Sequence, residues 1–181
     1  RQWTPAPWIN VLANASLGCL VSESGSGYTW AINARENQLT PWSNDPVSDP
    51  PGEALYLRDE ETGEIWSPTP LPIRGDGFYV VRHGQGYSRF EYEVRGIATD
   101  LTVLVAREDP VKISRLWVEN RSETTRTLTV TAYAEWVLGP QRAKGAPFVV
   151  TELDSETGAL FARNAWNEEH AGRVAFADIG G

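Results

Sequence analysis

The sequence predicts an all-β fold in which two antiparallel sheets pack face to face. Apolar residues recur with a period of two along several runs, those runs are rich in Thr, Val and Tyr, and turn sequences separate them. Alternation places one set of side chains in a core and the other set outside it, and β-branched and aromatic residues favour the pleated backbone. About 11 to 13 short strands joined by tight turns are typical of a β-sandwich.

Three runs show the alternation most clearly. In residues 90–95 (FEYEVR) apolar side chains alternate with charged or polar ones, and residues 101–105 (LTVLV) keep Leu, Val and Val at every second position. Residues 127–138 carry Leu, Val, Ala and Trp on one side and mainly Thr, Tyr and Glu on the other. Each run is therefore predicted to be a strand with one face on the core.

The run at residues 111–118 breaks this pattern. Val111 and Ile113 set one phase of the alternation, whereas Leu116 and Val118 set the other. Two explanations are open at this point. One is a β-bulge near residues 114–115, which would shift the phase by one residue, and the other is a strand that is buried on both faces.

Turn sequences separate the predicted strands. The segments 59–64 (DEETGE), 120–125 (NRSETT) and 154–158 (DSETG) are predicted to be turns, and the glycine of the first supplies the positive φ that a hairpin needs. The segments 25–28 (GSGY) and 84–87 (GQGY) are predicted to be tight turns that enter strands, because neither precedes the helix that a phosphate-binding loop requires.

The length and composition fit one domain of a longer protein. The 181 residues are enough to bury a sizeable core, and residues 1–181 are predicted to form a single β-sandwich domain. The chain contains no Met, so we expect it to be a fragment. Four prolines between residues 41 and 52 predict a long irregular loop.

Charge and cysteine content narrow the classes of partner. The formal net charge is −8, and an acidic chain repels the phosphate backbone, so no nucleic-acid partner is expected. No apolar run approaches the roughly 18 residues of a membrane span. The single cysteine, Cys19, lies in an apolar run and is predicted to be a buried, unreactive thiol. One cysteine also fits a reducing compartment.

No pattern in the sequence predicts a catalytic residue, a cofactor or a metal. The two histidines, His83 and His170, lie in unrelated segments and do not form a metal site. Carboxylates are plentiful, but nothing in the sequence brings two of them together as an acid–base pair. The eight Trp and six Tyr either fill a core or stack on sugar rings, and for any one Trp the core is favoured.

Seven short motifs add a resemblance to a known family. In order along the chain they are TPAPWINVL (4–12), GSGYTW (25–30), LTPWSND (39–45), GEALYLRDE (52–60), WSPT (66–69), RHGQGYS (82–88) and YAEWVLG (133–139). Together they resemble the amino-terminal domain of the inverting disaccharide phosphorylases, glycoside hydrolase family ninety-four, formerly glycosyltransferase family thirty-six. Within the family, residues 39–74 look most like the phosphorylase-type module of cyclic β-1,2-glucan synthases.

The resemblance implies a galactose mutarotase-like super-sandwich followed by a helical linker and an (α/α)6 barrel that carries the catalytic Asp. It implies that this chain is a non-catalytic part of a multidomain, glucan-processing glycosyltransferase or phosphorylase, although whether the fragment alone is an enzyme stays open. Family sandwiches are longer than this chain, so edge strands are expected to be missing.

The same resemblance implies partners and a location. The partners are a β-glucan oligosaccharide or polysaccharide, the chain's own downstream barrel, and a second copy in a homodimer. No cofactor is implied. The location is the cytoplasm, as a module of an inner-membrane protein where the parent is a cyclic glucan synthase.

Eight residues within these motifs are predicted to bind carbohydrate or to face the barrel. Trp and Tyr supply flat faces, and Arg, Asp, Asn and His supply directional hydrogen bonds to hydroxyls. The residues are Trp8, Asn10, Trp42, Arg58, Asp59, Trp66, His83 and Tyr87. The alternative is that they brace a domain interface.

Three functions are therefore open from the sequence. The first is a non-catalytic scaffold or carbohydrate-binding domain of a glucan-processing enzyme. The second is an independent carbohydrate-binding module in which Trp42 or Trp66 contacts the sugar, and the third is a purely structural dimerisation domain.

Overall fold

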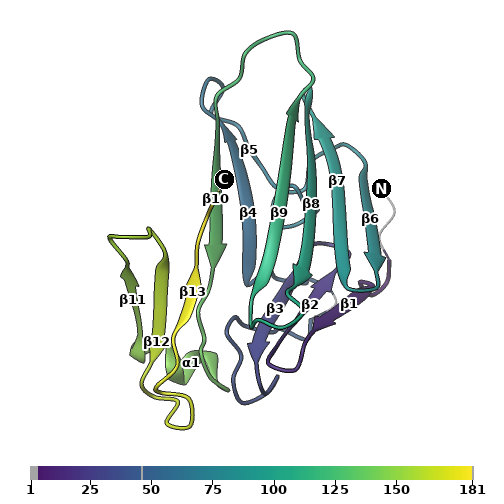
Figure 1. The fold of residues 1–181 in the computed structure, drawn as a ribbon. Coiled ribbons are helices and arrows are strands. Elements are labelled where there is room, and N and C mark those ends of the chain that lie inside the picture. The colour runs from purple at the N-terminus through teal and green to yellow at the C-terminus, as the bar shows by residue number, and fades with distance from the viewer. Residues whose placement is uncertain (1–3, 46, 181) are drawn as a thin grey trace.

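The computed structural model describes residues 4–45 and 47–180, which form an almost entirely β structure (Figure 1). Its strands are β1 (Ile9–Ala13), β2 (Leu17–Ser22), β3 (Gly27–Ala31), β4 (Glu53–Asp59), β5 (Ile65–Trp66), β6 (Tyr79–Gly84), β7 (Tyr87–Val94), β8 (Ile97–Val105), β9 (Lys112–Asn120), β10 (Leu128–Ala134), β11 (Val149–Leu153), β12 (Leu160–Asn164) and β13 (Ala175–Ala177). A short helix, α1 (Arg142–Gly145), and a 3-10 turn (Ala146–Phe148) lie between β10 and β11. Among the residues described, no helix is long and apolar enough to cross a membrane.

The strands form four sheets, and every strand pairing in the described part of the chain is antiparallel. One layer is the four-stranded sheet β6-β7-β8-β9. Two three-stranded sheets, β10-β4-β5 and β1-β2-β3, pack against it, and a further sheet, β11-β12-β13, stands to one side (Figure 1). The predicted all-β antiparallel super-sandwich is confirmed, with one of its layers divided between two small sheets.

Two apolar clusters fill the space between the layers. One joins the β1-β2-β3 sheet to the four-stranded sheet and contains Leu12, Cys19, Val21, Phe90, Leu101 and Val103. The other joins the β10-β4-β5 sheet to the same four strands and contains Leu57, Trp66, Tyr92 and Ile97. Leu116 of β9 packs against both clusters. The alternation predicted for residues 90–95 and 101–105 therefore has the expected consequence, because its apolar members line the core.

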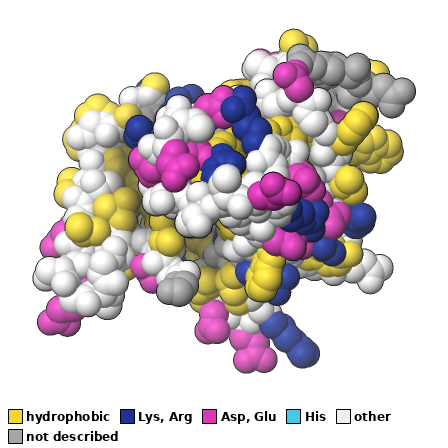
Figure 2. Space-filling model, turned by 90° about the horizontal axis from the view of Figure 1, so that it is seen from above, with side chains coloured by type: hydrophobic (Ala, Val, Ile, Leu, Met, Phe, Trp, Pro, Cys, Tyr) yellow, Lys and Arg dark blue, Asp and Glu magenta, His cyan; other side chains and the backbone are white. Residues whose placement is uncertain are grey.

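The end of the sandwich at the top of Figure 1 carries mixed charge. Seen from that end, basic side chains lie among acidic ones and do not gather in a patch of a single sign (Figure 2). The loops and strand ends of the sandwich hold such pairs, for example Arg95 with Glu64 and Arg121 with Glu93. The acidic excess of the whole chain is thus not focused on this face.

The turn predictions agree with the backbone. Gly63 and Gly158 have φ values of 74° and 78°, the positive φ that only glycine adopts freely. Gly25 and Gly86 likewise have positive φ, and strands β3 and β7 begin within two residues of them. The proline-rich loop contains no helix or strand over its described residues, and Pro46 lies outside the described residues.

Strand β9 contradicts both explanations offered for its change of phase. It pairs with β8 in one unbroken register from Ile97↔Asn120 to Val105↔Lys112, so there is no bulge. It is also an edge strand, largely exposed, so it is not buried on both faces. The phase changes because the inward position at the start of the strand is taken by Lys112, a charged residue whose ammonium group reaches a carboxylate inside the sandwich.

Lys112 belongs to a largely buried polar cluster. Its Nζ donates to Glu53 at the start of β4, and Glu53 Oε1 accepts hydrogen bonds from the hydroxyls of Thr29 and Thr40, each 2.6 Å long. Burial by itself would raise the pKa of Glu53, but the nearby Lys112 ammonium and the hydrogen bonds outweigh it and lower that pKa. Burial would likewise lower the pKa of Lys112, but Glu53 outweighs it and raises that pKa. Both groups are therefore charged at neutral pH.

Removing one member of this pair should destabilise the fold strongly. Glu53→Gln or Lys112→Met leaves the other charge buried without its partner, and we expect a loss of about 3 kcal/mol in the free energy of unfolding. The double variant should lose less than the sum of the single losses, since neither charge is then stranded. Urea unfolding of the four proteins measures this, and additive losses would contradict the pairing.

The pair also sets a pH dependence. Because the pKa of Glu53 is lowered, its contribution to stability is complete above the ordinary carboxyl pKa of about 4.3 and is lost as the pH falls through the lower value in the folded state. The raised pKa of Lys112 makes its contribution complete below about 10.4 and lost at higher pH. The loss of folding stability at low pH should therefore be smaller in Glu53→Gln, because glutamine cannot be protonated in this pH range.

The thiol of Cys19 should be unreactive in the folded chain. Its side chain is fully buried, and burial raises its pKa to about 11, so the thiolate is scarce at neutral pH. A thiol reagent such as dithionitrobenzoate should label it only after unfolding in denaturant. Rapid labelling of the native chain would show that the core around β2 opens readily.

Candidate functional site

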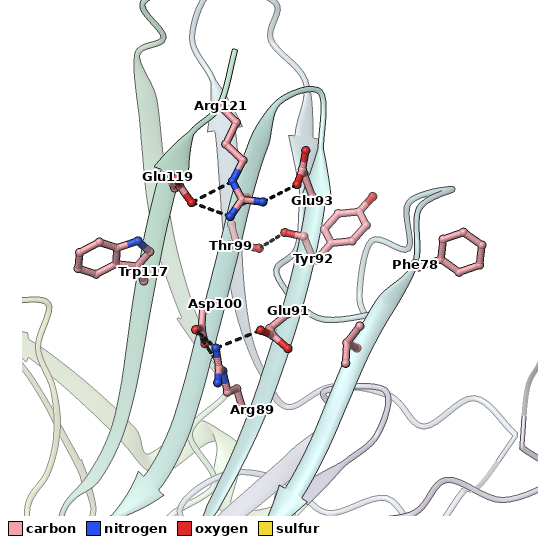
Figure 3. Close-up of a pocket in the computed structure, with 12 residues that line it drawn as sticks. Phe78, Arg89, Glu91, Tyr92, Glu93, Thr99, Asp100, Trp117, Glu119 and Arg121 are labelled. Carbon is pink, nitrogen blue, oxygen red and sulfur yellow. Dashed lines mark hydrogen bonds and ion pairs between the residues drawn. The ribbon is translucent and has the colours of Figure 1, made fainter.

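The eight residues predicted from the sequence do not meet in one place. Asn10, His83 and Tyr87 lie where β1 meets the β6–β7 hairpin, and three more belong to the β4–β5 hairpin. Trp42 lies in the proline-rich loop, and Trp8 precedes β1 with its indole exposed. A hollow on the outer face of the four-stranded sheet contains none of the eight (Figure 3).

The amide nitrogen of Asn10 and Nδ1 of His83 contact the fold itself, whereas His83 Nε2 is buried without a hydrogen-bond partner among the described residues. The Asn10 amide donates to the carbonyls of Gly84 and Tyr87, at 3.0 and 2.9 Å, and to the hydroxyl of Ser88. His83 Nδ1 lies 2.9 Å from that same hydroxyl, which is buried. A Cβ at Gly84 would overlap the Tyr87 ring, so glycine makes room for the ring. These contacts hold β1 against the hairpin, while part of Tyr87 stays exposed.

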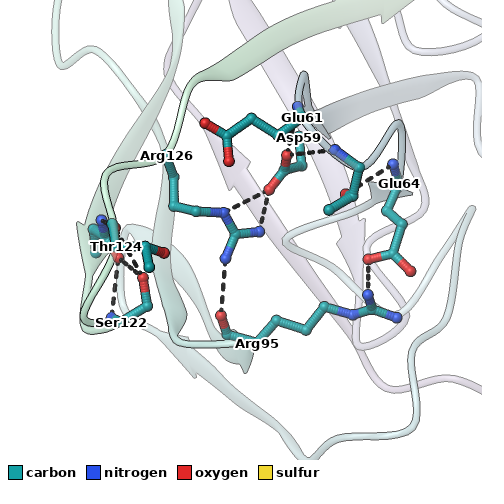
Figure 4. A network of polar contacts seen from close by, with 9 residues as sticks. Asp59, Glu61, Glu64, Arg95, Ser122, Thr124 and Arg126 are labelled. Atoms are coloured by element: carbon teal, nitrogen blue, oxygen red, sulfur yellow. Dashed lines mark hydrogen bonds and ion pairs between the residues drawn. The ribbon is translucent and has the colours of Figure 1, made fainter.

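The three residues of the β4–β5 hairpin have different surroundings. Asp59 is fully buried, and its carboxylate accepts hydrogen bonds from Arg126 and from the backbone N–H groups of residues 61 and 62 (Figure 4). Arg126 and these backbone bonds hold the pKa of Asp59 below its ordinary value. Trp66 is 6% exposed and belongs to the core. Arg58 is exposed and pairs with Glu60 at 3.7 Å.

Trp42 is the predicted residue that lies in a groove. Its ring stacks on Tyr28, with centroids 5.3 Å apart and planes 15° apart, and 50% of Trp42 remains exposed. The groove has a volume of about 290 Å³ and is lined by Trp42, Pro41, Gly52, Glu135, Arg142 and their neighbours. We call it the Trp42 groove.

Two charged residues in this groove were not singled out by the sequence. Arg142 donates two hydrogen bonds to the carboxylate of Glu135, of 2.5 and 2.8 Å, in the paired geometry that fixes both side chains. The Glu135 backbone N–H also donates to the carbonyl of Gly52, which ties the end of β10 to the loop. Glu135 lies in one of the motifs quoted above. It shares a groove with Trp42 only because segments remote in the sequence pack together, so the sequence pattern could not predict it.

The groove combines an open aromatic face with fixed donors and acceptors. Such a surface can stack on the apolar C–H face of a sugar ring and hydrogen-bond to its hydroxyls. In the described residues no group of three or more His, Cys, Asp and Glu side chains is placed to hold a metal ion.

Comparison with known proteins gives one consistent result. Residues 1–181 match the family model described as glycosyl hydrolase 94, supersandwich domain. The cyclic beta-(1,2)-glucan synthase NdvB of Rhizobium meliloti (strain 1021) is 43% identical over 179 residues, which cover 96% of this chain and 6% of that protein.

Two groups of phosphorylases are also similar. The N,N'-diacetylchitobiose phosphorylase of Vibrio furnissii is 33% identical over 75% of this chain and 17% of its own length. The solabiose phosphorylase of Paenibacillus borealis is 32% identical over 75% of this chain and 18% of its own length. The chain spans less than a fifth of each of these relatives.

Proposed function

This chain belongs to the supersandwich domain family of glycosyl hydrolase 94, and we propose that it is a non-catalytic domain of a glucan-processing enzyme, in which the Trp42 groove contacts a β-glucan chain. The enzyme class is that of glucan synthases and phosphorylases, and the finer assignment, a cyclic β-1,2-glucan synthase, is supported by the 43% identity over nearly all of this chain. The catalytic residues of the parent enzyme would lie in another domain, for which we propose the (α/α)6 barrel.

The observation that carries the proposal is the orientation of Trp42. One face of its indole is fixed on Tyr28, which leaves the other side of a pre-oriented aromatic ring open in the groove. A ring that is already held in place loses little conformational entropy when a ligand stacks on it. The nearby Glu135–Arg142 pair supplies both acceptors and donors for sugar hydroxyls.

The location follows from the same proposal. A domain of a cyclic glucan synthase would work on the cytoplasmic side of the inner membrane, as a module of a membrane-bound parent. The single buried thiol is compatible with a reducing compartment.

The Trp42 groove can be tested with the isolated chain. β-1,2-linked gluco-oligosaccharides are titrated into isotope-labelled protein, and the indole N–H signals and the backbone amide signals of the groove are followed by NMR, the amide signals serving for the Trp42→Ala variant. We expect saturable shifts of the Trp42 signal, and Trp42→Ala should weaken this binding by about fivefold or more, the effect of losing one stacked ring.

The matched control is Trp8→Ala, which removes another exposed indole outside the groove. It should leave the titration unchanged. An unshifted Trp42 signal at millimolar sugar would mean that the groove does not bind glucan by itself, and equal effects of both substitutions would mean that the stacking argument is wrong.

A second candidate, a structural dimerisation domain, is favoured by apolar side chains on one face of the β11-β12-β13 sheet, a face that also carries Glu152 and Arg163. Phe161 and Phe176 face each other across β12 and β13, and Val150 lies on the same side of the neighbouring β11. Val150 and Phe176 are exposed. Exposed apolar residues gathered on one sheet are typical of a protein contact.

This candidate predicts self-association through the β11-β12-β13 sheet. Light scattering after size-exclusion chromatography should then show a dimer at high protein concentration, and Phe176→Asp should shift it to monomer because a charge would be buried at the contact. Val47→Asp, at an exposed position far from this sheet in the sequence, is the control. A monomer at every concentration would exclude the candidate for this chain.

A further inference from the structure

The outer face of the four-stranded sheet carries a second groove, with a volume of about 400 Å³. Trp117 of β9 stands on one side and Phe78, just before β6, on the other, and charged side chains of β7, β8 and β9 lie between them (Figure 3). We call it the Phe78–Trp117 groove. It faces away from both apolar clusters, since the inward residues of the same strands fill the core.

The strand register explains why the sheet is hollow here. Ala98 of β8 is paired with Glu93 of β7 on one side and Glu119 of β9 on the other. A methyl group between two longer side chains leaves a depression in the surface of the sheet. Strand β9, which carries Trp117, and strand β6, which begins just after Phe78, are three strand spacings apart, roughly 14 Å, which leaves room for a short oligosaccharide.

The walls are unusually exposed aromatic rings. Phe78 is 95% exposed and Trp117 is 66% exposed, so neither ring is required by the core. By contrast, Phe90 and Tyr92 of β7 are buried in the core. Two exposed rings on either side of one groove provide flat apolar surfaces to a ligand.

The floor of the groove consists of the charged side chains of β7, β8 and β9 that lie between the two aromatic rings, and hydrogen bonds hold these side chains in place. Arg89 donates to Asp100 with bonds of 2.6 to 3.1 Å and to Glu91 at 3.0 Å. Arg121 donates to Glu93 at 2.8 Å and to Glu119 at 2.7 Å. Each carboxylate keeps further acceptor positions beyond the bonds it makes to arginine.

The floor of the groove holds four carboxylates and two arginines, and each carboxylate is already bound to an arginine, which decides the class of ligand. An anionic ligand would meet paired arginines and an acidic protein, and a cationic one would compete with arginines already bound to the carboxylates. An apolar peptide would bury charged groups at a high desolvation cost. A neutral ligand with many hydroxyls and apolar C–H faces satisfies both the floor and the walls.

We propose that the Phe78–Trp117 groove is a binding site for a short neutral oligosaccharide. The groove lies on β6 to β9, and none of its residues belongs to the Trp42 groove, so this inference goes beyond the proposed function and does not depend on it. Two separate sugar contacts on one domain would hold a long glucan chain more firmly than either contact alone.

The test uses the full chain and site-specific NMR signals. Cellotetraose and a β-1,2-linked glucotetraose are titrated while the Trp117 and Trp42 indole signals are followed separately. We expect saturable shifts of the Trp117 signal with at least one of these neutral sugars and none with a polygalacturonate oligosaccharide of the same length.

Two substitutions test the walls without threatening the fold, since both side chains are largely exposed. Trp117→Ala and Phe78→Ala should each weaken binding by about fivefold or more, and Trp117→Phe should recover most of the loss because it restores an aromatic ring. Binding to Phe78→Ala is read from the Trp117 signal, and binding to the Trp117 variants is read from backbone amide signals of the groove. Trp8→Ala is the matched control and Trp42→Ala is the control for the other groove, and neither should change binding here.

Each contrary result has a distinct meaning. Shifts of Trp42 without shifts of Trp117 would overturn the second site and leave the proposed function standing. Shifts of Trp117 alone would support the second site and contradict the Trp42 groove. Concentration-dependent shifts of the Trp117 indole and of the backbone amides of the groove without sugar would identify the face as a contact between copies and overturn the proposal, if Trp117→Ala also abolished the amide shifts.

Discussion

The buried pair of Glu53 and Lys112 is the contact on which the arrangement of this domain depends. Glu53 begins β4, Lys112 begins β9 and Thr29 lies in β3, so the cluster joins all three sheets of the sandwich. Apolar clusters alone would tolerate sliding of one sheet over another, because dispersion and hydrophobic contacts have little direction. A charge pair with two hydroxyl partners is directional, because its hydrogen bonds form in one geometry, and it therefore fixes one alignment of the sheets.

The same cluster places the Trp42 groove. Thr40 donates to Glu53, and the Thr40 hydroxyl also accepts a hydrogen bond from the backbone N–H of Thr29. The proline-rich loop therefore leaves the core from a fixed point, two residues before Trp42. Tyr28, the ring on which Trp42 stacks, is the neighbour of Thr29 in β3. The exposed aromatic face is thus positioned by a polar contact in the interior.

How far the sequence could predict this structure depends on whether a feature is local. The alternation at residues 90–95 and the glycine turns at Gly63 and Gly158 were predicted correctly because both depend on neighbours in the chain. The start of β9 was predicted wrongly. Its inward position is taken by Lys112, which interrupts the apolar alternation because it pairs with Glu53, 59 residues away. The sequence also could not separate Trp66, which is buried, from Trp42 and Trp117, which are exposed. Which face of a strand meets the core depends on register with remote strands, and composition does not encode it.

The electrostatics of the domain suit binding and positioning. Glycoside cleavage with a general acid needs a carboxyl group whose pKa is raised towards neutrality. In the described part of the chain, the carboxyl groups with shifted pKa values, Asp45, Glu53, Asp59 and Asp154, are all shifted the other way. Each is lowered by hydroxyls, backbone N–H groups or a cation, so each is held ionised as an acceptor. Carboxylates of this kind fix loops and side chains in place, which is the role indicated by the hydrogen bonds that Asp45, Asp59 and Asp154 accept from the backbone of their own turns.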